Sequence, residues 1–198
     1  MIRRLPAIAL LLCLSAMFTI ADEKSIDPKI RKIIDDISEA RIKSNIEKLV
    51  SFGTRNTMST QDDPVHGVGA ARQWIFKELQ SYSPRLEVKF DKYRVKKQGQ
   101  RIFKDVDLWN VVAVLPGKKS PETQILVSGH YDTLNLGNRV AGTPAGPGSE
   151  AAPVPVGERP QIIPEESEKM AELPAPGACD DGSGTATVME LARVMSQY

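Results

Sequence analysis

The sequence predicts an α/β fold in which a mixed sheet lies between two layers of helices. Helical apolar patterns fill residues 27–82, an alternating strand pattern follows at 86–95, and continuous apolar runs come at 111–115 and 125–127. Such continuous runs are typical of central strands covered on both faces. Helices before and after them indicate a three-layer α/β/α domain. The 198 residues, 41% of them hydrophobic, suffice for one globular domain.

The first half of the chain supplies the helices on one side of this predicted sheet. Asp27 and Pro28 suit the start of a first helix, since Asp caps well and Pro fits the first helical position. Ser44 and Glu47 match a capping box for a second helix, which Gly53 ends. A third helix spans 67–82 and buries one apolar side made of Ala71, Trp74, Ile75, Phe76 and Leu79.

Strands and one last helix are predicted for the rest of the domain. Leu86, Val88 and Phe90 alternate with charged residues, as in a half-buried strand, and Gly99 marks a hairpin turn. The two continuous apolar runs then form central strands. A last helix begins after Thr185, and its apolar face consists of Val188, Leu191, Ala192 and Met195.

The N-terminus has the pattern of a secretory signal peptide at residues 1–21. Arg3 and Arg4 precede an uncharged apolar run, and the small residues Thr19 and Ala21 suit cleavage before Asp22. We therefore expect a mature domain at 22–198 that is exported, to the periplasm or the extracellular space, and has no stable membrane span. An uncleaved anchor is the alternative, because the run approaches the length that spans a bilayer. A net charge of +1 gives no basic surface for nucleic acid.

A proline-rich stretch interrupts the domain at 134–176. Eight of the fourteen prolines fall between Arg139 and Pro176, and no helical or strand periodicity persists there. The composition predicts a long loop inserted into the domain.

His130 and Asp132 follow the second buried run, in the segment LVSGHYDT. Open α/β sheets place functional groups at the ends of such strands. A metal-bound imidazole needs a carboxylate to hold its ring, and Asp132 is a candidate for that role. The alternative is a surface histidine followed by a turn aspartate, which the short pattern alone would favour.

Asp180 and Asp181 stand side by side in the turn APGACDDGSG. Small residues let the backbone turn tightly and bring carboxylates close to another group. Adjacent negative charges repel, and a divalent cation would relieve that repulsion. Ordinary helix-start chemistry is the alternative, and it explains Asp181 and Ser183 better than the second acid or the glycines.

Together these segments resemble the exported aminopeptidases with two co-catalytic zinc ions. That superfamily includes bacterial leucyl aminopeptidases, aminopeptidases S and Y, glutamate carboxypeptidase and the transferrin receptor ectodomain. The resemblance is carried by FGTRNT (52–57), GVGAARQWIFKEL (67–79), NVVAVLPG (110–117), ILVSGHYDT (125–133) and PGACDDGSGTATVMELARVM (176–195). It implies a zinc-peptidase-like domain acting on peptide or protein substrates.

The resemblance also implies roles for single residues. His130 would bind one zinc ion, and Asp180 would bridge two zinc ions with its two oxygens. Asp132 would orient His130, while Asp181 would support the turn, which in this superfamily often contains a cis peptide bond.

Further metal ligands and a glutamate general base of the superfamily come after the next strand, so we expect them to be absent from this chain. The pair Glu165 and Glu166 precedes the aspartate turn and is rejected as a substitute, and His66 is interpreted as a surface residue. The sequence therefore predicts an N-terminal portion whose C-terminal half is missing and which is inactive alone. Cys179 is either a small buried residue or a soft extra ligand.

Two other functions remain open at this stage. One is a non-catalytic binding ectodomain of the same fold, and the other is a carboxypeptidase-type two-metal hydrolase. The co-occurrence of His130, Asp132 and Asp180 favours an enzyme, because a domain without metals has no need of these three groups together.

Overall fold

A computed structural model describes residues 26–99, 102–120, 122–135 and 164–198. The predicted signal peptide and most of the predicted insertion lie outside these residues. The chain divides into two compact units, Met1–Ile34 and Asp35–Tyr198. The elements are α1 (Pro28–Asp35), α2 (Glu39–Ser51), α3 (Gly67–Tyr82), β1 (Glu87–Val95), β2 (Val106–Val114), α4 (Pro164–Glu172), the turn η3 (Ala178–Gly182) and α5 (Ser183–Met195).

Helix α1 begins as predicted. The Asp27 carboxylate accepts a hydrogen bond from the backbone N–H of Lys29 at 2.7 Å, and Pro28 occupies the first helical position.

Helix α2 begins earlier than predicted, since it is capped by Ser38 instead of Ser44 and starts at Glu39. The Ser38 hydroxyl accepts from the backbone N–H of Arg41, and the Ser38 N–H donates to Glu190 at 2.8 Å. Glu190, which lies on α5, thus takes the place of the acid in a capping box. The predicted end is confirmed, since Gly53 follows with a φ of 74°.

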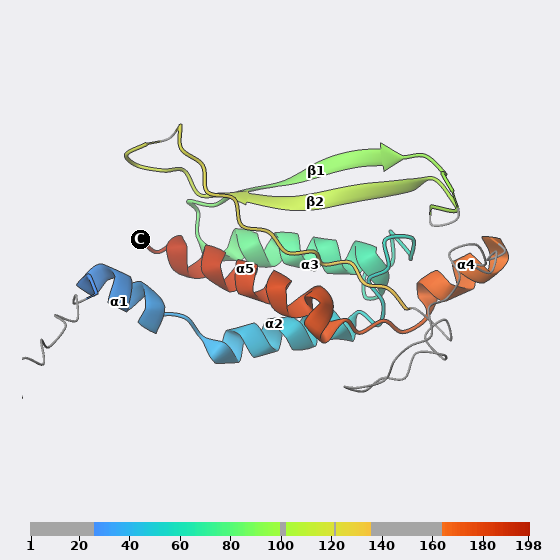
Figure 1. Cartoon of the computed structure of the whole chain (residues 1–198), viewed down its shortest axis with the longest axis horizontal. Coiled ribbons are helices and arrows are strands. Elements are labelled where there is room, and N and C mark those ends of the chain that lie inside the picture. The colour runs from blue at the N-terminus through green and yellow to red at the C-terminus, as the bar shows by residue number, and fades with distance from the viewer. Residues whose placement is uncertain (1–25, 100–101, 121, 136–163) are drawn as a thin grey trace, which may run out of the picture. The chain divides into compact units, whose positions relative to one another are not determined.

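Strands β1 and β2 form the predicted antiparallel hairpin, and Gly99 in the turn has a φ of 58°. Helix α3 matches its predicted bounds and lies against both strands. Phe76 of α3 stacks on Phe90 of β1, with ring centroids 4.4 Å apart. Helices α2, α3 and α5 lie on one side of this sheet (Figure 1). The α/β class is confirmed, and the described residues contain one of its two predicted helical layers.

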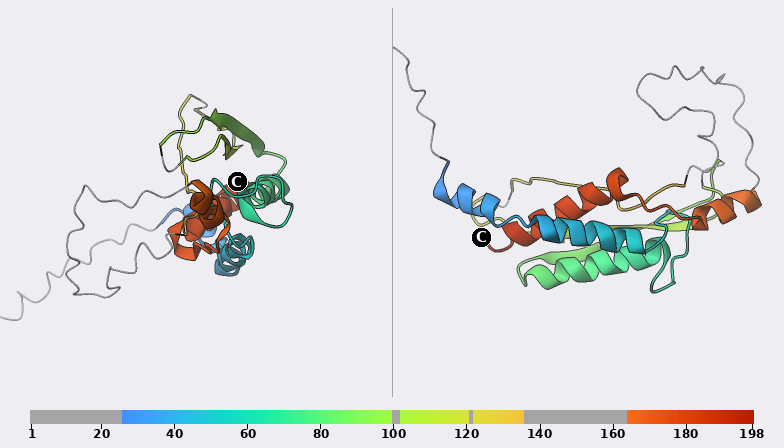
Figure 2. Two further views of the ribbon diagram at one scale, coloured as in Figure 1. Left: turned by 90° about the vertical axis from the view of Figure 1, so that its right-hand side faces the viewer. Right: turned by 90° about the horizontal axis from the view of Figure 1, so that it is seen from below.

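The main core lies where α2, α3 and α5 meet. Leu49, Ile75, Leu79 and Met189 are buried there, with Trp74 and Val111 packed against them. The two further views show α5 beside both α2 and α3 (Figure 2). This packing fixes the start of α5, which follows the aspartate turn.

Two predictions about strands and loops are wrong. Residues 125–127 form no strand, and Ile125 and Leu126 are 91% and 90% exposed. A strand needs a neighbour for its backbone groups, and among the described residues this segment has none. Residues 164–172, predicted as loop, form α4. Proline suits its first position, and Glu, Lys, Met and Ala favour helix.

No helix among the described residues is both long enough and apolar enough to cross a membrane.

Candidate metal site

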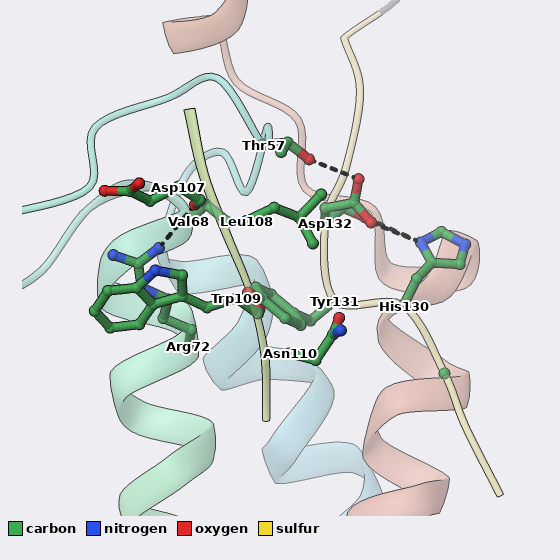
Figure 3. Close-up of a pocket in the computed structure, with 11 residues that line it drawn as sticks. Thr57, Val68, Arg72, Asp107, Leu108, Trp109, Asn110, His130, Tyr131 and Asp132 are labelled. Carbon is green, nitrogen blue, oxygen red and sulfur yellow. Dashed lines mark hydrogen bonds and ion pairs between the residues drawn. The ribbon is translucent and has the colours of Figure 1, made fainter. Parts of the chain in front are cut away.

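His130, Asp132 and the aspartate turn come together although His130 and Asp180 lie far apart in the sequence. The segment that carries His130 runs beside a cleft of about 190 Å³ between α3 and β2. Figure 3 shows the cleft, whose lining includes Thr57, Arg72, Trp109, His130, Tyr131 and Asp132. Tyr131 fixes this segment to the sheet, because its hydroxyl donates to the Trp109 carbonyl at 2.6 Å.

The imidazole of His130 lies between two aspartates. Its Nε2 is 3.1 Å from Oδ1 of Asp180, and its Nδ1 is 3.3 Å from Oδ1 of Asp132. Two ligands of one tetrahedral zinc ion, each about 2.0–2.1 Å from the metal, stand roughly 3.3 Å apart. The separation of Nε2 from Asp180 therefore fits a shared zinc ion. The Asp180 side chain is 91% exposed, so its other oxygen is accessible.

Asp132 is itself held in place by a hydrogen bond. Its Oδ2 accepts from the Thr57 hydroxyl at 2.9 Å, while its Oδ1 faces His130 (Figure 3). The Asp132 backbone carbonyl also lies 3.2 Å from Nδ1 of His130. These acceptors favour a proton on Nδ1. The lone pair of Nε2 then stays free of a proton and faces Asp180.

Asp181 joins the His130 segment to the start of α5. Its Oδ2 accepts from the backbone N–H of His130 at 3.0 Å, and its Oδ1 accepts from the N–H of Gly184 at 3.1 Å. Glycine is required beside this carboxylate. A Cβ on Gly129 would lie 3.1 Å from Oδ2, and one on Gly184 would overlap the carboxylate.

The electrostatics of the site favour a cation. Partial burial lowers the pKa of His130, but the Asp132 carbonyl and the carboxylates of Asp132, Asp181 and Asp180 outweigh it, so the pKa is raised above its ordinary value. A field that stabilises the imidazolium also stabilises a metal ion at the same place.

The Asp180–Asp181 peptide bond is cis, as the resemblance implies. Cys179, next to them, is exposed, so its interpretation as a small buried residue is wrong. His66 precedes α3 and pairs with Glu172 at 3.6 Å, outside this site. The rejected Glu165 lies in the first turn of α4.

Within the described part of the chain, no three His, Cys, Asp or Glu side chains form a complete metal site. His130 and Asp180 supply two ligands, and a catalytic zinc ion usually keeps three from the protein. The residues present thus fit part of a zinc site, and their roles as ligands stay a prediction.

Sequence reasoning did not single out Arg55, although the residue lies within the quoted segment FGTRNT. Arg55 is 1% exposed and its guanidinium contacts the backbone beside both metal motifs. A basic residue in a polar loop gives no signal of burial, so only the folded chain reveals it.

Comparison with known proteins agrees with the resemblance. Residues 110–198 match the profile of Peptidase family M28. The chain is 37% identical over 174 residues to a probable zinc metalloprotease of Pyricularia oryzae, which covers 86% of this chain and 28% of that protein. It is 35% identical over 179 residues to a probable zinc metalloprotease of Pyrenophora tritici-repentis, covering 87% of this chain and 34% of that protein.

A more distant relative is leucine aminopeptidase 1 of Ajellomyces capsulatus, 24% identical over 172 residues, or 84% of this chain and 31% of that protein. The chain spans about a third of the length of these relatives. The predicted resemblance to zinc peptidases is confirmed.

Proposed function

We propose that the whole protein is a zinc-dependent aminopeptidase of peptidase family M28, whose profile matches residues 110–198 of this chain. The observation that carries the proposal is the 3.1 Å separation of His130 Nε2 from Asp180 Oδ1. Asp132 and Asp181 both contact His130 and hold it in place. His130 and Asp180 are thus positioned to share a metal ion.

The residues divide the work between binding and positioning. His130 and Asp180 bind zinc, Asp132 orients the imidazole, and Asp181 fixes the turn. A zinc ion held there would polarise the scissile carbonyl and lower the pKa of its bound water. The proposal requires at least one further ligand and a general base from outside the described residues, because Asp132 and Asp181 already serve other groups.

We propose two zinc ions, bridged by Asp180. One oxygen of its carboxylate faces His130, and the exposure of the side chain leaves the other within reach of a second ion. Two metals about 3.5–4 Å apart are a common arrangement in aminopeptidases.

Peptides with a free amino terminus are the proposed substrates. The similarity to a leucine aminopeptidase supports this over a carboxypeptidase specificity. The apolar N-terminal segment supports export, in which case N-terminal sequencing of the secreted protein should begin at Asp22.

The test is the release of amino acids from three versions of one peptide by the whole protein. We expect cleavage of the free peptide and of its C-terminally amidated form, but none of the N-acetylated form. A chelator should abolish release, and added Zn²⁺ should restore it. Cleavage of the acetylated but not the amidated peptide would instead indicate a carboxypeptidase.

Asp180→Ala tests the site itself, with Asp62→Ala as the control. Asp62 is an exposed aspartate in the loop before α3. We expect Asp180→Ala to lose activity and Asp62→Ala to keep it. Full activity in Asp180→Ala would refute the assignment of the metal ligand.

A further inference from the structure

We propose that Arg55 is a positioning residue that holds the two metal-binding motifs in register, so that zinc affinity depends on its guanidinium group. The inference rests on the proposed function, because it concerns the zinc ion that His130 and Asp180 would share. Arg55 does not touch that ion and acts through the backbone of the two motifs.

The guanidinium connects segments that are distant in sequence. Its Nε donates to the carbonyl of Tyr131 at 2.7 Å, next to His130. Its Nη1 and Nη2 donate to the carbonyls of Pro176 and Gly177 at 2.9 and 3.0 Å, at the entry to the aspartate turn. One planar group therefore sets the spacing between the two motifs.

Further contacts anchor Arg55 on both sides. Nη1 also donates to the carbonyl of Leu49 at 2.7 Å, in the last turn of α2. The backbone of Arg55 exchanges two hydrogen bonds with Thr133: its N–H donates to the Thr133 hydroxyl at 3.0 Å, and its carbonyl accepts from the Thr133 N–H at 3.1 Å. Arg55 and these hydrogen bonds form a clamp. The clamp is anchored both to α2 and to the segment that carries His130.

Close packing makes the clamp specific to arginine. Gly177 has a φ of 45°, and a Cβ there would lie 3.1 Å from Nη2 of Arg55. A lysine ammonium is a point donor and cannot reach four carbonyls in the plane that a guanidinium spans. The carbonyls it failed to reach would lose hydrogen bonds that are at least partly buried, and the two motifs would separate.

Arg55 keeps its positive charge despite its burial. Desolvation lowers the pKa of the guanidinium, and the nearby Asp132 carboxylate opposes that change. Because an arginine pKa starts so far above neutrality, the group stays charged and keeps all its donors.

The test is a Zn²⁺ titration of the whole protein, in competition with a chromophoric chelator, for wild type, Arg55→Lys and Arg193→Lys. Arg193 is a matched control, because its guanidinium also makes several hydrogen bonds, and these go to Glu190 and the Asp36 carbonyl instead of the two motifs. Thermal unfolding of each variant in chelator reports stability separately.

We expect Arg55→Lys to lower zinc affinity about 10- to 100-fold, the usual loss when a group that positions metal ligands is changed. Arg193→Lys should keep wild-type affinity even if its unfolding temperature falls as far as that of Arg55→Lys. If Arg55→Lys fails to fold, Thr133→Val, which removes one bond of the same clamp, should lower zinc affinity in the same direction.

Two results would overturn the inference. Unchanged zinc affinity in folded Arg55→Lys, or in Thr133→Val where the lysine variant does not fold, would reduce Arg55 to a purely structural role and leave the proposed function standing. A wild-type protein that does not bind zinc would refute the proposed function and the inference together.

Discussion

Alanine substitution should have a different effect at each of the two adjacent aspartates: a loss of stability at Asp181 and a loss of zinc affinity at Asp180. Asp181→Ala removes the hydrogen bond that its carboxylate accepts from the N–H of Gly184 in the first turn of α5, worth about 1 kcal/mol. It also removes a charge-assisted bond to the His130 N–H, worth about 1.5 kcal/mol. We therefore expect the free energy of unfolding to fall by about 2 to 3 kcal/mol. Asp180→Ala removes an exposed side chain whose contact, within the described residues, is with His130, so the change should stay within about 0.5 kcal/mol.

Urea unfolding in the presence of a chelator measures both variants without any contribution from bound metal. Zinc titration of the same samples gives the complementary result: Asp180→Ala should lose affinity outright. Equal stability of Asp181→Ala and wild type would refute the supporting role of Asp181. A loss in Asp180→Ala as large as that in Asp181→Ala would show that the two carboxylates do not divide their roles.

Three further predictions concern the surroundings of the site. Burial raises the pKa of Glu190, but hydrogen bonds from Arg193 and the Ser38 N–H, with the charges of Arg193 and Arg41, lower it further than burial raises it. Its stabilisation should be complete above the unfolded pKa of about 4.3 and be lost as the pH falls through the lower folded pKa. Glu190→Gln should flatten that acid limb in urea unfolding, and an unchanged limb would contradict the assignment. Thr57→Val removes the hydrogen bond to Asp132. It should weaken zinc affinity about tenfold and lower the free energy of unfolding by about 1 kcal/mol. Wild-type zinc affinity in this variant would show that Asp132 needs no support from Thr57. Gly177→Ala, whose Cβ would overlap Thr133, should lower the free energy of unfolding by about 2 to 4 kcal/mol. Gly99 also has a positive φ, but its added Cβ would meet nothing within 4 Å, so Gly99→Ala should lower it by only about 1 to 2 kcal/mol. Similar losses in the two variants would show that packing at Gly177 is loose.

Local patterns predicted the parts of the fold that local physics decides. The apolar period of residues 67–82 gave α3 its bounds, and the alternation in β1 with Gly99 gave the hairpin. The start of α2 was misplaced because its cap, Ser38, is completed by Glu190, 152 residues away. No local pattern contains such a partner.

In the candidate site, too, some features follow from local sequence and others depend on distant residues. The pattern of residues pointed to His130, Asp132 and the aspartate turn, since few structural roles need those groups together. The clamp made by Arg55 could not be predicted, because its acceptors are backbone carbonyls, which every residue has. Residues 125–127 carry a strand pattern, but a strand forms only where a neighbour provides hydrogen bonds, and sequence alone does not tell where that neighbour lies.

The central claim is that His130 and Asp180 bind one zinc ion. It is tested most directly by a crystal structure of the whole protein with Zn²⁺, using anomalous scattering to locate the metal. We predict zinc within about 2.0–2.2 Å of Nε2 of His130 and of a carboxylate oxygen of Asp180. Zinc bound elsewhere, with these two side chains still in direct contact, would contradict the claim.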